Sequence, residues 1–256
     1  MDMQAYAPYD LTGKTIMVTG ASSGIGRATA LRISRLGAKV ILVARNEERL
    51  QEVLKELEGP GAYYVYDLSD VDGIEAFVKK VVAEHGKFDG LMYSAGDCLR
   101  APIPVCKPAA VRNSMQINYF AFVEMLRCFG KSKTTNNNAS LVAMTSASSL
   151  RGERGLLTLC ASKAAMNSAV RCAALEFSNR KIRVNAISAA FVFGSRMVET
   201  TLENFGAEQV QETIAQTQPL GAGKPEDIAN AAAFLLSDAS GYMTGSIMAV
   251  DGGYSA

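Results

Sequence analysis

Three glycines near the beginning of the chain have the spacing of a phosphate-binding turn. Gly20, Gly24 and Gly26 form the pattern G-x-x-x-G-x-G directly after the apolar run 16–18. That run predicts a buried strand, and the apolar spacing over 28–36 predicts a helix after the glycines. Bare backbone allows a ligand to approach closely, and the free N–H groups of a helix N-terminus attract a pyrophosphate. A flexible glycine loop is the alternative, but the order strand, turn and helix favours a nucleotide site.

The histidine and cysteine content excludes several other kinds of catalytic site. His85 is the only histidine, so a multi-His metal site cannot form, and we expect neither a His-based triad nor a metal. It precedes Gly86, where a helix is expected to end, and a favourable charge at that terminus is the simplest interpretation. The five cysteines contain no C-x-x-C pair and are odd in number. They are therefore expected to be small buried hydrophobes in a reducing, cytoplasmic compartment.

The composition is that of an ordinary globular protein of 256 residues, 48% hydrophobic and 20% charged. The net charge is +1 and acids and bases are mixed along the chain, so we expect neither nucleic acid nor a membrane surface as a partner. No apolar run is long enough to span a bilayer. Residues 1–10 lack the features of a secretory signal and are expected to form a short tail.

Strand and helix patterns alternate along the chain, which indicates how the glycine turn is positioned. The expected strands are 16–18, 39–44, 62–66, 88–94, 140–145, 182–187 and 246–250. Helices are expected after Asn46, from Ser69 or Asp70, up to about Phe129, over 158–178, and from Pro225 to about 236. The polar segment KSKTTNNNAS before the fifth strand is interpreted as a solvated loop.

Short strand–helix units of this kind imply an α/β fold with a parallel sheet and helices on both faces. We therefore predict a single domain over residues 1–256, a Rossmann-type doubly wound sheet of about seven strands. Ligands are expected at the carboxyl ends of the strands. Segment 189–206 has no clear period and is expected to be a substrate lid.

Further motifs follow the glycine turn in a recognisable order. They are TGASSGIG (19–26), DLSD (67–70), SAG (94–96), Asn118, Ser146, ASKAA (161–165), RVNAIS (183–188), KPEDIA (224–229) and TGSIMAVDGG (244–253). In these motifs the chain resembles the short-chain dehydrogenase/reductase family, specifically its 3-oxoacyl-carrier-protein-reductase-like members, from about residue 11 to 254. The resemblance implies a nicotinamide dinucleotide, hydride transfer to or from the carbonyl or alcohol of a small molecule, and a homotetramer or homodimer.

The end of the second strand bears on the choice of cofactor. NAD-binding relatives place an acidic residue there to accept a hydrogen bond from the ribose 2′-hydroxyl. This chain has Arg45 instead, which can pair with a 2′-phosphate, so NADP(H) is the expected cofactor. A solvated surface arginine is the alternative. The expected cofactor contacts are Gly20, Ser22, Ser23, Gly24, Ile25, Gly26, Arg45, Asp67, Leu68, Ala95, Gly96, Lys163 and Val192.

The family's catalytic set is an Asn, a Ser, a Tyr and a Lys, the last two spaced Y-x-x-x-K. The resemblance assigns three of these roles to Asn118, Ser146 and Lys163. The i, i+4 spacing places both side chains on one helix face, so that the ammonium lowers the pKa of the phenol and the Tyr acts as general acid or base. Here the Tyr position is occupied by Leu159, which can neither donate nor accept a proton. The nearby candidates Cys160, Tyr93 and Tyr119 are interpreted as packing residues.

Other departures from the family cluster around the expected nicotinamide and substrate. The family's N-N-A-G is YSAG at 93–96, its Pro-Gly is Ala-Ala at 189–190, and its following Thr aligns with Gly194, beside Ser195. The segment RGER at 151–154 lies where the family builds the wall of the substrate site. A solvated charged turn is the expected role of this segment, and recognition of an anionic substrate by its two arginines is the alternative.

These observations predict an NADP(H)-dependent oxidoreductase that acts on a carbonyl or alcohol with an atypical catalytic set. General acid–base catalysis contributes about 10²–10⁴-fold, so the loss of the Tyr need not abolish turnover. Ser146 is expected to polarise the carbonyl and Lys163 to hold the nicotinamide ribose, with water relayed through Lys163 as the proton source. The alternative is a non-catalytic NADP(H)-binding sensor or partner subunit.

Overall fold

Seven parallel strands form the centre of the molecule in a computed structural model that describes residues 8–195, 198–199 and 206–256. Their order across the sheet is β3-β2-β1-β4-β5-β6-β7. The strands are β1 (Thr15–Thr19), β2 (Lys39–Ala44), β3 (Gly61–Val65), β4 (Phe88–Tyr93), β5 (Thr135–Met144), β6 (Arg183–Ala189) and β7 (Ile247–Val250). The predicted doubly wound Rossmann-type sheet is confirmed.

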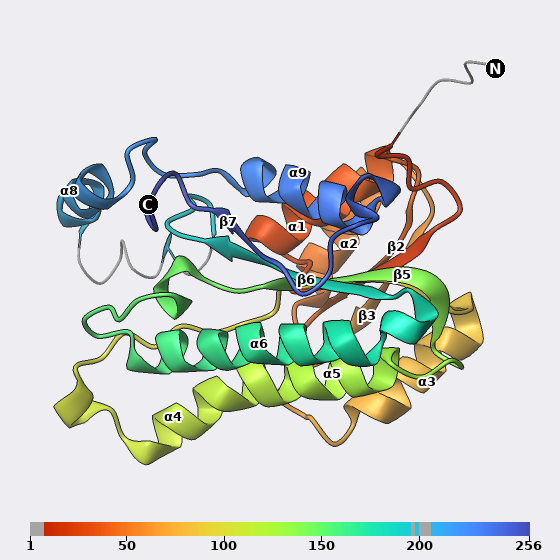
Figure 1. The fold of residues 1–256 in the computed structure, drawn as a ribbon, viewed down its shortest axis with the longest axis horizontal. Helices are drawn as coiled ribbons and strands as arrows, with labels where there is room; N and C mark the ends of the chain where they lie inside the picture. Colours follow the sequence, from red (N-terminus) through yellow and green to blue (C-terminus); the bar gives the residue numbers. More distant parts are fainter. Residues whose placement is uncertain (1–7, 196–197, 200–205) are drawn as a thin grey trace.

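Helices cover both faces of this sheet (Figure 1). One face carries α1 (Gly24–Arg35), α2 (Glu47–Glu56) and α9 (Pro225–Leu236), and the other carries α3 (Ile74–His85), α4 (Pro108–Met115), α5 (Ala121–Phe129) and α6 (Leu157–Glu176). Helix α8 (Ala207–Thr217) lies at one end of the molecule. Short helical turns cover Ile103–Val105, Gln116–Phe120, Ala147–Ser149, Ser178–Arg180 and Asp238–Ser240.

Each face of the sheet has its own apolar core because the strands are buried on both sides. Phe77 and Phe122 pack in the core beneath α3, α5 and α6. Ile33 and Leu50 pack in the core beneath α1, α2 and α9. These cores hold the carboxyl ends of the strands in place, and between β1 and β4 the strand order reverses. Such a reversal opens a crevice that is the usual ligand site of this architecture.

Two helices begin where the sequence predicts, with identifiable caps. The Asn46 side chain accepts a hydrogen bond from the Arg49 N–H (2.8 Å) at the start of α2. Pro225 is the first residue of α9, and the Asp227 carboxylate accepts from the Lys224 N–H (2.8 Å). Both contacts satisfy N–H groups that have no partner within the helix.

Other boundaries differ from the expectations. Strand β5 begins at Thr135, so part of the polar connector is strand, and Arg180 secures its start through Asn137 Oδ1 (3.1 Å) and the Thr135 carbonyl. Helix α3 begins at Ile74 because the carboxylates of DLSD (67–70) hold local backbone N–H groups in turns first. Helix α8 was not expected at all, since its polar sequence has only two buried residues.

The expected tail and lid fall partly outside the described residues, which exclude 1–7, 196–197 and 200–205. Within the described part, Pro8 accepts a hydrogen bond from the Ala239 N–H (3.1 Å), and Val192 forms a bridge with Gly223. No helix among the described residues is long and apolar enough to cross a membrane.

Candidate active site

The glycine turn between β1 and α1 is built so that only glycine fits at its key positions. Gly20 has φ +66° and Gly24 has φ +51°, in the left-handed region that disfavours other residues. A Cβ on Gly26 would lie 2.2 Å from the Gly20 carbonyl oxygen. Helix α1 therefore starts directly against the turn and presents its first N–H groups to the crevice, the arrangement that binds a pyrophosphate.

Replacing Gly26 with Ala is expected to abolish high-affinity nucleotide binding, because the backbone of the turn must move to relieve the clash. Overpacking of this kind costs about 1–3 kcal/mol, so the midpoint of thermal unfolding is expected to fall as well. Calorimetric titration with NADPH and thermal unfolding measure the two effects. Gly152→Ala is the control, since a Cβ there meets nothing within 4 Å. Unchanged affinity in Gly26→Ala would contradict the assignment of the turn.

A cavity of about 290 Å³ opens beside this turn. It is lined by Ser22, Ser23, Gly24, Arg27, Arg49, Glu52, Val53, Gly194 and Glu199. Arg49 was not among the expected cofactor contacts. The helix cap at Asn46, which the sequence predicts, is the feature that places Arg49 in the first turn of α2. Gly194 and Ser195 close the cavity from the other side, since a Cβ on Gly24 would lie 3.2 Å from Ser195 Cα. The segment that contains Val192 therefore reaches the glycine turn.

The ends of β2 and β3 bring Arg45 and Asp67 together. Arg45 Nη1 lies 3.8 Å from Asp67 Oδ2, and both side chains are largely exposed. Burial raises the pKa of Asp67, but hydrogen bonds from Ser69 and the charge of Arg45 outweigh it and leave that pKa below its ordinary value. The sequence patterns give no sign that the two residues meet. In the structure the Asp67 carboxylate partly balances the charge of Arg45. Leu68 is buried next to this pair.

Asn118 lies in a π-helical turn, Gln116–Phe120, that joins α4 to α5. Such turns are frequent at functional sites because the extra residue re-aims a side chain. The Asn118 amide donates to the Asp97 carbonyl (2.9 Å) and the Ser162 hydroxyl (3.0 Å), and its Oδ1 accepts from the Asp97 N–H (2.9 Å). It is fully buried and ties the segment after β4 to helix α6.

Lys163 is a buried cation without a carboxylate partner among the described residues. Its Nζ donates to the Met144 carbonyl (2.8 Å) and approaches Met166 Sδ (3.5 Å). Burial lowers the pKa of Lys163 to about 8. A Cβ on Gly96 would lie 2.9 Å from Asn118 Oδ1 and 3.4 Å from Lys163 Nζ. Asn118 and Lys163 therefore converge on the bare backbone of Gly96.

Ser146 and Leu159 occupy the other two of the four catalytic positions that the resemblance implies. Ser146 follows β5, two residues after the carbonyl that Lys163 contacts, and its Oγ accepts from the Ser148 N–H (3.2 Å). Leu159 is 3% exposed and lies one helical turn before Lys163 on α6. The structure thus places an apolar side chain beside the cation, at the position where the resemblance expects a phenol.

The two tyrosines among the nearby candidates are engaged in other contacts. The Tyr93 hydroxyl donates to the Ile117 carbonyl (2.7 Å), and burial raises the pKa of Tyr93 far above its ordinary value. Tyr119 packs against Phe120 with ring centroids 5.6 Å apart. These contacts agree with the packing role expected for both tyrosines.

The end of β4 is joined to the glycine turn by a single hydroxyl. Thr19 Oγ1 accepts from the N–H groups of Ser94 (3.1 Å) and Ala95 (3.2 Å). Because Gly96 follows directly, this contact places the candidate catalytic residues Asn118 and Lys163 and the glycine turn at one edge of the sheet.

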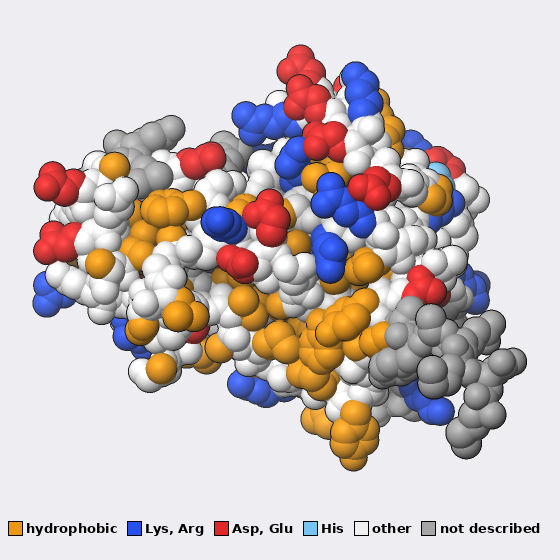
Figure 2. Space-filling model, turned by 90° about the horizontal axis from the view of Figure 1, so that it is seen from above, with side chains coloured by type: hydrophobic (Ala, Val, Ile, Leu, Met, Phe, Trp, Pro, Cys, Tyr) orange, Lys and Arg blue, Asp and Glu red, His pale blue; other side chains and the backbone are white. Residues whose placement is uncertain are grey.

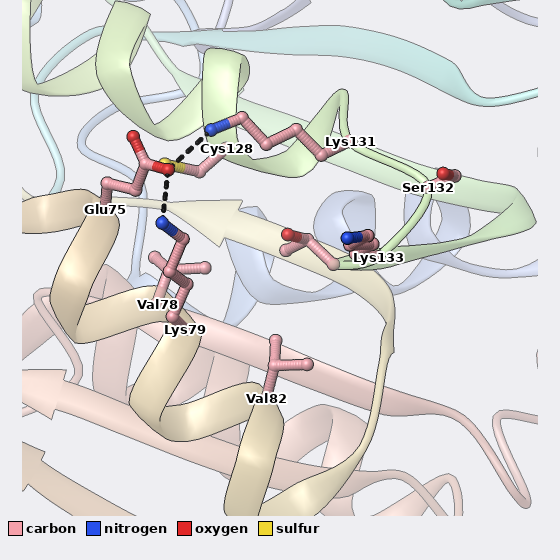
Figure 3. A pocket seen from close by; sticks show the side chains of 9 residues that line it. Glu75, Val78, Lys79, Val82, Cys128, Lys131, Ser132 and Lys133 are labelled. Carbon is pink, nitrogen blue, oxygen red and sulfur yellow. Dashed lines mark hydrogen bonds and ion pairs between the residues drawn. The ribbon is translucent and has the colours of Figure 1, made fainter.

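A larger cavity of about 550 Å³ lies elsewhere, between α3 and the end of α5 (Figure 3). In Figure 3 Lys79 and Lys131 both point toward Glu75, at 2.8 Å and 2.9 Å. Arg127 also pairs with Glu75, and these three cations hold the pKa of the Glu75 carboxyl well below its ordinary value. None of the expected site residues lines this cavity. We interpret the charged side chains at this cavity as an ion-pair cluster that joins α3 to the end of α5.

Comparison with known proteins agrees with this geometry. A family model described as enoyl-(acyl carrier protein) reductase matches residues 20–255. The chain is 34% identical to the 3-oxoacyl-[acyl-carrier-protein] reductase FabG of Thermotoga maritima, over 95% of this chain and 98% of the relative. It belongs to the short-chain dehydrogenase/reductase family. As a short-chain dehydrogenase/reductase, it is an enzyme of the oxidoreductase class.

Two further members of the short-chain dehydrogenase/reductase family show how broad the similarity is. The L-xylulose reductase of Caenorhabditis elegans is 30% identical over 97% of this chain and 98% of its own. A solved structure from Beutenbergia cavernae, described as an NAD(P)-dependent gluconate 5-dehydrogenase with bound NADP, is 31% identical with a TM-score of 0.89. It covers 97% of this chain and 99% of its own. The similarity thus includes the sheet, the glycine turn and the whole of α6.

Proposed function

We propose that this protein is an NADP(H)-dependent oxidoreductase that interconverts the carbonyl and alcohol forms of a small molecule. The observation that carries the proposal is the convergence of Asn118 and Lys163 on Gly96, at the sheet edge that also carries the glycine turn. A nicotinamide cofactor supplies or accepts the hydride when bound. In the relatives named above, this chemistry acts on a 3-oxoacyl group or a sugar derivative.

Each proposed catalytic residue has a role that its surroundings support. Ser146 offers its hydroxyl to the substrate oxygen, at the start of a turn that is held by backbone hydrogen bonds. Lys163 is a buried cation with no carboxylate partner among the described residues and holds the nicotinamide ribose, while Asn118 fixes the loop at Asp97. In place of the missing phenol, water relayed through Lys163 carries the proton. We expect slow turnover, since a positioned acid or base contributes about 10²–10⁴-fold.

The preference for NADP(H) over NAD(H) is proposed from the charges around the cofactor crevice. Arg49 lines the cavity beside Ser22 and Ser23, and Arg45 lies at the end of β2. A guanidinium binds a phosphate through paired, charge-assisted hydrogen bonds. Asp67 faces Arg45 at 3.8 Å, so a 2′-phosphate is expected to compete with this carboxylate for the arginine.

Calorimetric titration of the purified protein with NADPH and NADH tests this preference. We expect the NADPH affinity to be at least about tenfold higher, since a hydrogen bond to a charged group contributes about 1.5–3 kcal/mol. Arg45→Ala and Arg49→Ala are expected to weaken NADPH binding and leave NADH binding unchanged. Arg32→Ala is the matched control, because Arg32 is exposed on α1. Equal affinities in the unmodified protein would remove the basis for NADP(H), and failure of both cofactors to bind would overturn the proposed function.

We also propose that residues 1–256 form one domain, in the cytoplasm, that assembles into a homodimer or homotetramer. The five cysteines are free, which supports a reducing compartment, although the expected burial is found only for Cys128 and Cys172 is exposed. Exposed apolar side chains on α6 (Leu157, Leu175) and on or beside α5 (Val123, Phe120) support association of copies. Acidic and basic side chains are interspersed on the face seen in Figure 2, which supports a small molecule rather than nucleic acid as the partner.

A further inference from the structure

Glu153 connects a neighbouring turn and two distant segments of the chain through one carboxylate. Its Oε2 accepts from the hydroxyls of Ser148 (2.9 Å) and Tyr254 (2.9 Å), and its Oε1 accepts from Arg100 Nη2 (3.1 Å). The Glu153 side chain is 19% exposed. The expected solvated turn at 151–154 is therefore wrong for Glu153, although Arg151 and Arg154 are exposed. A carboxylate that leaves water is stable only when donors replace its hydration, and Glu153 has three.

One of these donors links Glu153 to the proposed catalytic serine. Ser148 is 7% exposed, and its hydroxyl is held by Glu153 while its own N–H donates to Ser146 Oγ (3.2 Å). The Ser146 carbonyl in turn accepts from the Ser149 N–H (2.9 Å). The position of the Ser146 hydroxyl thus depends on a short turn that two side chains beyond it hold. Glu153 accepts from the Ser148 hydroxyl, and the Asn167 amide on α6 donates to Ser149 Oγ (2.8 Å).

The second donor comes from the C-terminal turn. Tyr254 is 5% exposed, and the Arg151 guanidinium lies 4.1 Å from the centre of its ring. Burial raises the pKa of Tyr254, so its hydroxyl stays protonated and donates to Glu153. Asp251 holds the same turn by accepting from the N–H groups of Gly253 (3.1 Å) and Ser255 (3.1 Å). The chain end is thereby fixed to the segment that follows β5.

The third donor belongs to the segment after β4. Arg100 follows Asp97, which Asn118 fixes at the other end of the same segment. The Ala101 N–H donates to the Gly155 carbonyl (2.8 Å), so a backbone contact reinforces the ion pair between Arg100 and Glu153. Asn118 and Glu153 therefore hold the two ends of one loop against α6 and the turn before it.

We propose that Glu153 is a positioning residue of the active site, which orients the Ser146 hydroxyl through Ser148 while it holds the Arg100 loop and the C-terminal Tyr254 in place. This inference rests on the proposed oxidoreductase chemistry at Ser146. Glu153 acts through other residues and takes no part in the reaction itself. The removal of its charge should therefore lower the rate of the chemical step without a comparable loss of cofactor affinity.

The test compares Glu153→Gln and Tyr254→Phe with the unmodified protein. Glu153→Gln preserves the size of the side chain but loses the charge, and Tyr254→Phe removes one donor while it keeps the ring beneath Arg151. Glu176→Gln is the matched control, because Glu176 is exposed on α6. Turnover is measured with NADPH and a 3-oxoacyl thioester, NADPH affinity by calorimetry, and amide hydrogen exchange on peptides that cover 97–107, 146–158 and 251–256.

For Glu153→Gln we expect kcat to fall about tenfold, as for the loss of a hydrogen bond to a charged group. KM for NADPH and its calorimetric affinity should stay unchanged, and exchange should rise in all three peptides. Tyr254→Phe should raise exchange at 251–256 and lower kcat less. Unchanged kcat in Glu153→Gln, or unchanged exchange over 146–158, would overturn the inference. A protein that binds no NADPH, or reduces no thioester even as Leu159→Tyr, would instead contradict the proposed function, and the exchange over 146–158 would still decide whether Glu153 holds Ser146.

Discussion

Replacing Leu159 with Tyr is expected to raise the rate of NADPH-dependent carbonyl reduction by about 10²-fold or more, the usual contribution of a positioned general acid. Leu159 is buried one helical turn before Lys163, so a phenol there would lie on the same helix face as the ammonium. The ammonium would lower the phenol pKa toward neutrality and make it a better acid and base. Turnover with NADPH and a panel of small ketones and 3-oxoacyl thioesters measures the gain.

Leu159→Phe is the matched control for this experiment, because it adds the ring without the hydroxyl. The aromatic ring must fit where the buried Leu159 side chain now packs, and both variants bear that cost equally. A gain in Leu159→Tyr that is absent in Leu159→Phe would identify the hydroxyl as the cause. A gain below about tenfold would be far less than general acid catalysis supplies. That result would indicate that the site is not built for this chemistry and would favour a cofactor-binding role without turnover.

Replacing Lys163 with Met should stabilise the cofactor-free protein and at the same time damage its function. Burial lowers the pKa of Lys163 from 10.5 to about 8, which corresponds to a destabilisation of about 3 kcal/mol when the side chain is charged. Met avoids this penalty but loses the hydrogen bond to the Met144 carbonyl, about 1 kcal/mol. The net gain of about 2 kcal/mol raises the midpoint of thermal unfolding by about 4–8 °C for a chain of this size. NADPH affinity should fall, since the variant loses the cation proposed to hold the ribose.

The pH dependence separates this explanation from a general packing effect. Below about pH 8 Lys163 is charged in both the folded and the unfolded protein, so the full penalty applies. As the pH rises from about 8 to 10.5, the folded protein releases the proton first and the stability of the unmodified protein rises. The advantage of Lys163→Met should therefore shrink across this window. Lys55→Met, at an exposed position on α2, should show no such trend. A pH-independent advantage would contradict the assignment of a buried charge.

Sequence patterns predicted the elements that depend on local interactions. The apolar runs of the strands and the caps at Asn46 and Pro225 act over a few residues, and the structure confirms both helix starts. The glycine spacing requires a turn that other residues cannot form, because φ at Gly20 and the space at Gly26 are restricted by neighbouring backbone. Where local side chains compete with these patterns the prediction failed, as at DLSD, whose carboxylates delay the start of α3.

Contacts between distant segments were beyond the reach of these patterns. Strand β5 begins at Thr135, which pairs with Phe88 of β4 and whose carbonyl accepts a hydrogen bond from Arg180, 45 residues further on. The partial neutralisation of Arg45 by Asp67 depends on the pairing of β2 with β3. Arg49 enters the candidate cofactor cavity only because α2 packs beside the glycine turn. In each case the interaction follows from the order of the strands, which no local pattern encodes.

The parallel sheet, the glycine turn and the absence of a phenol at position 159 could all be inferred from residue types and short spacings. The folded chain was needed to show that Lys163 is a buried cation without a described carboxylate partner, and that Glu153 is an anchor rather than a solvated charge. This difference arises because the state of an ionisable side chain depends on how much water it loses and which donors replace that water. For Glu153 those donors are 5, 53 and 101 residues away along the chain.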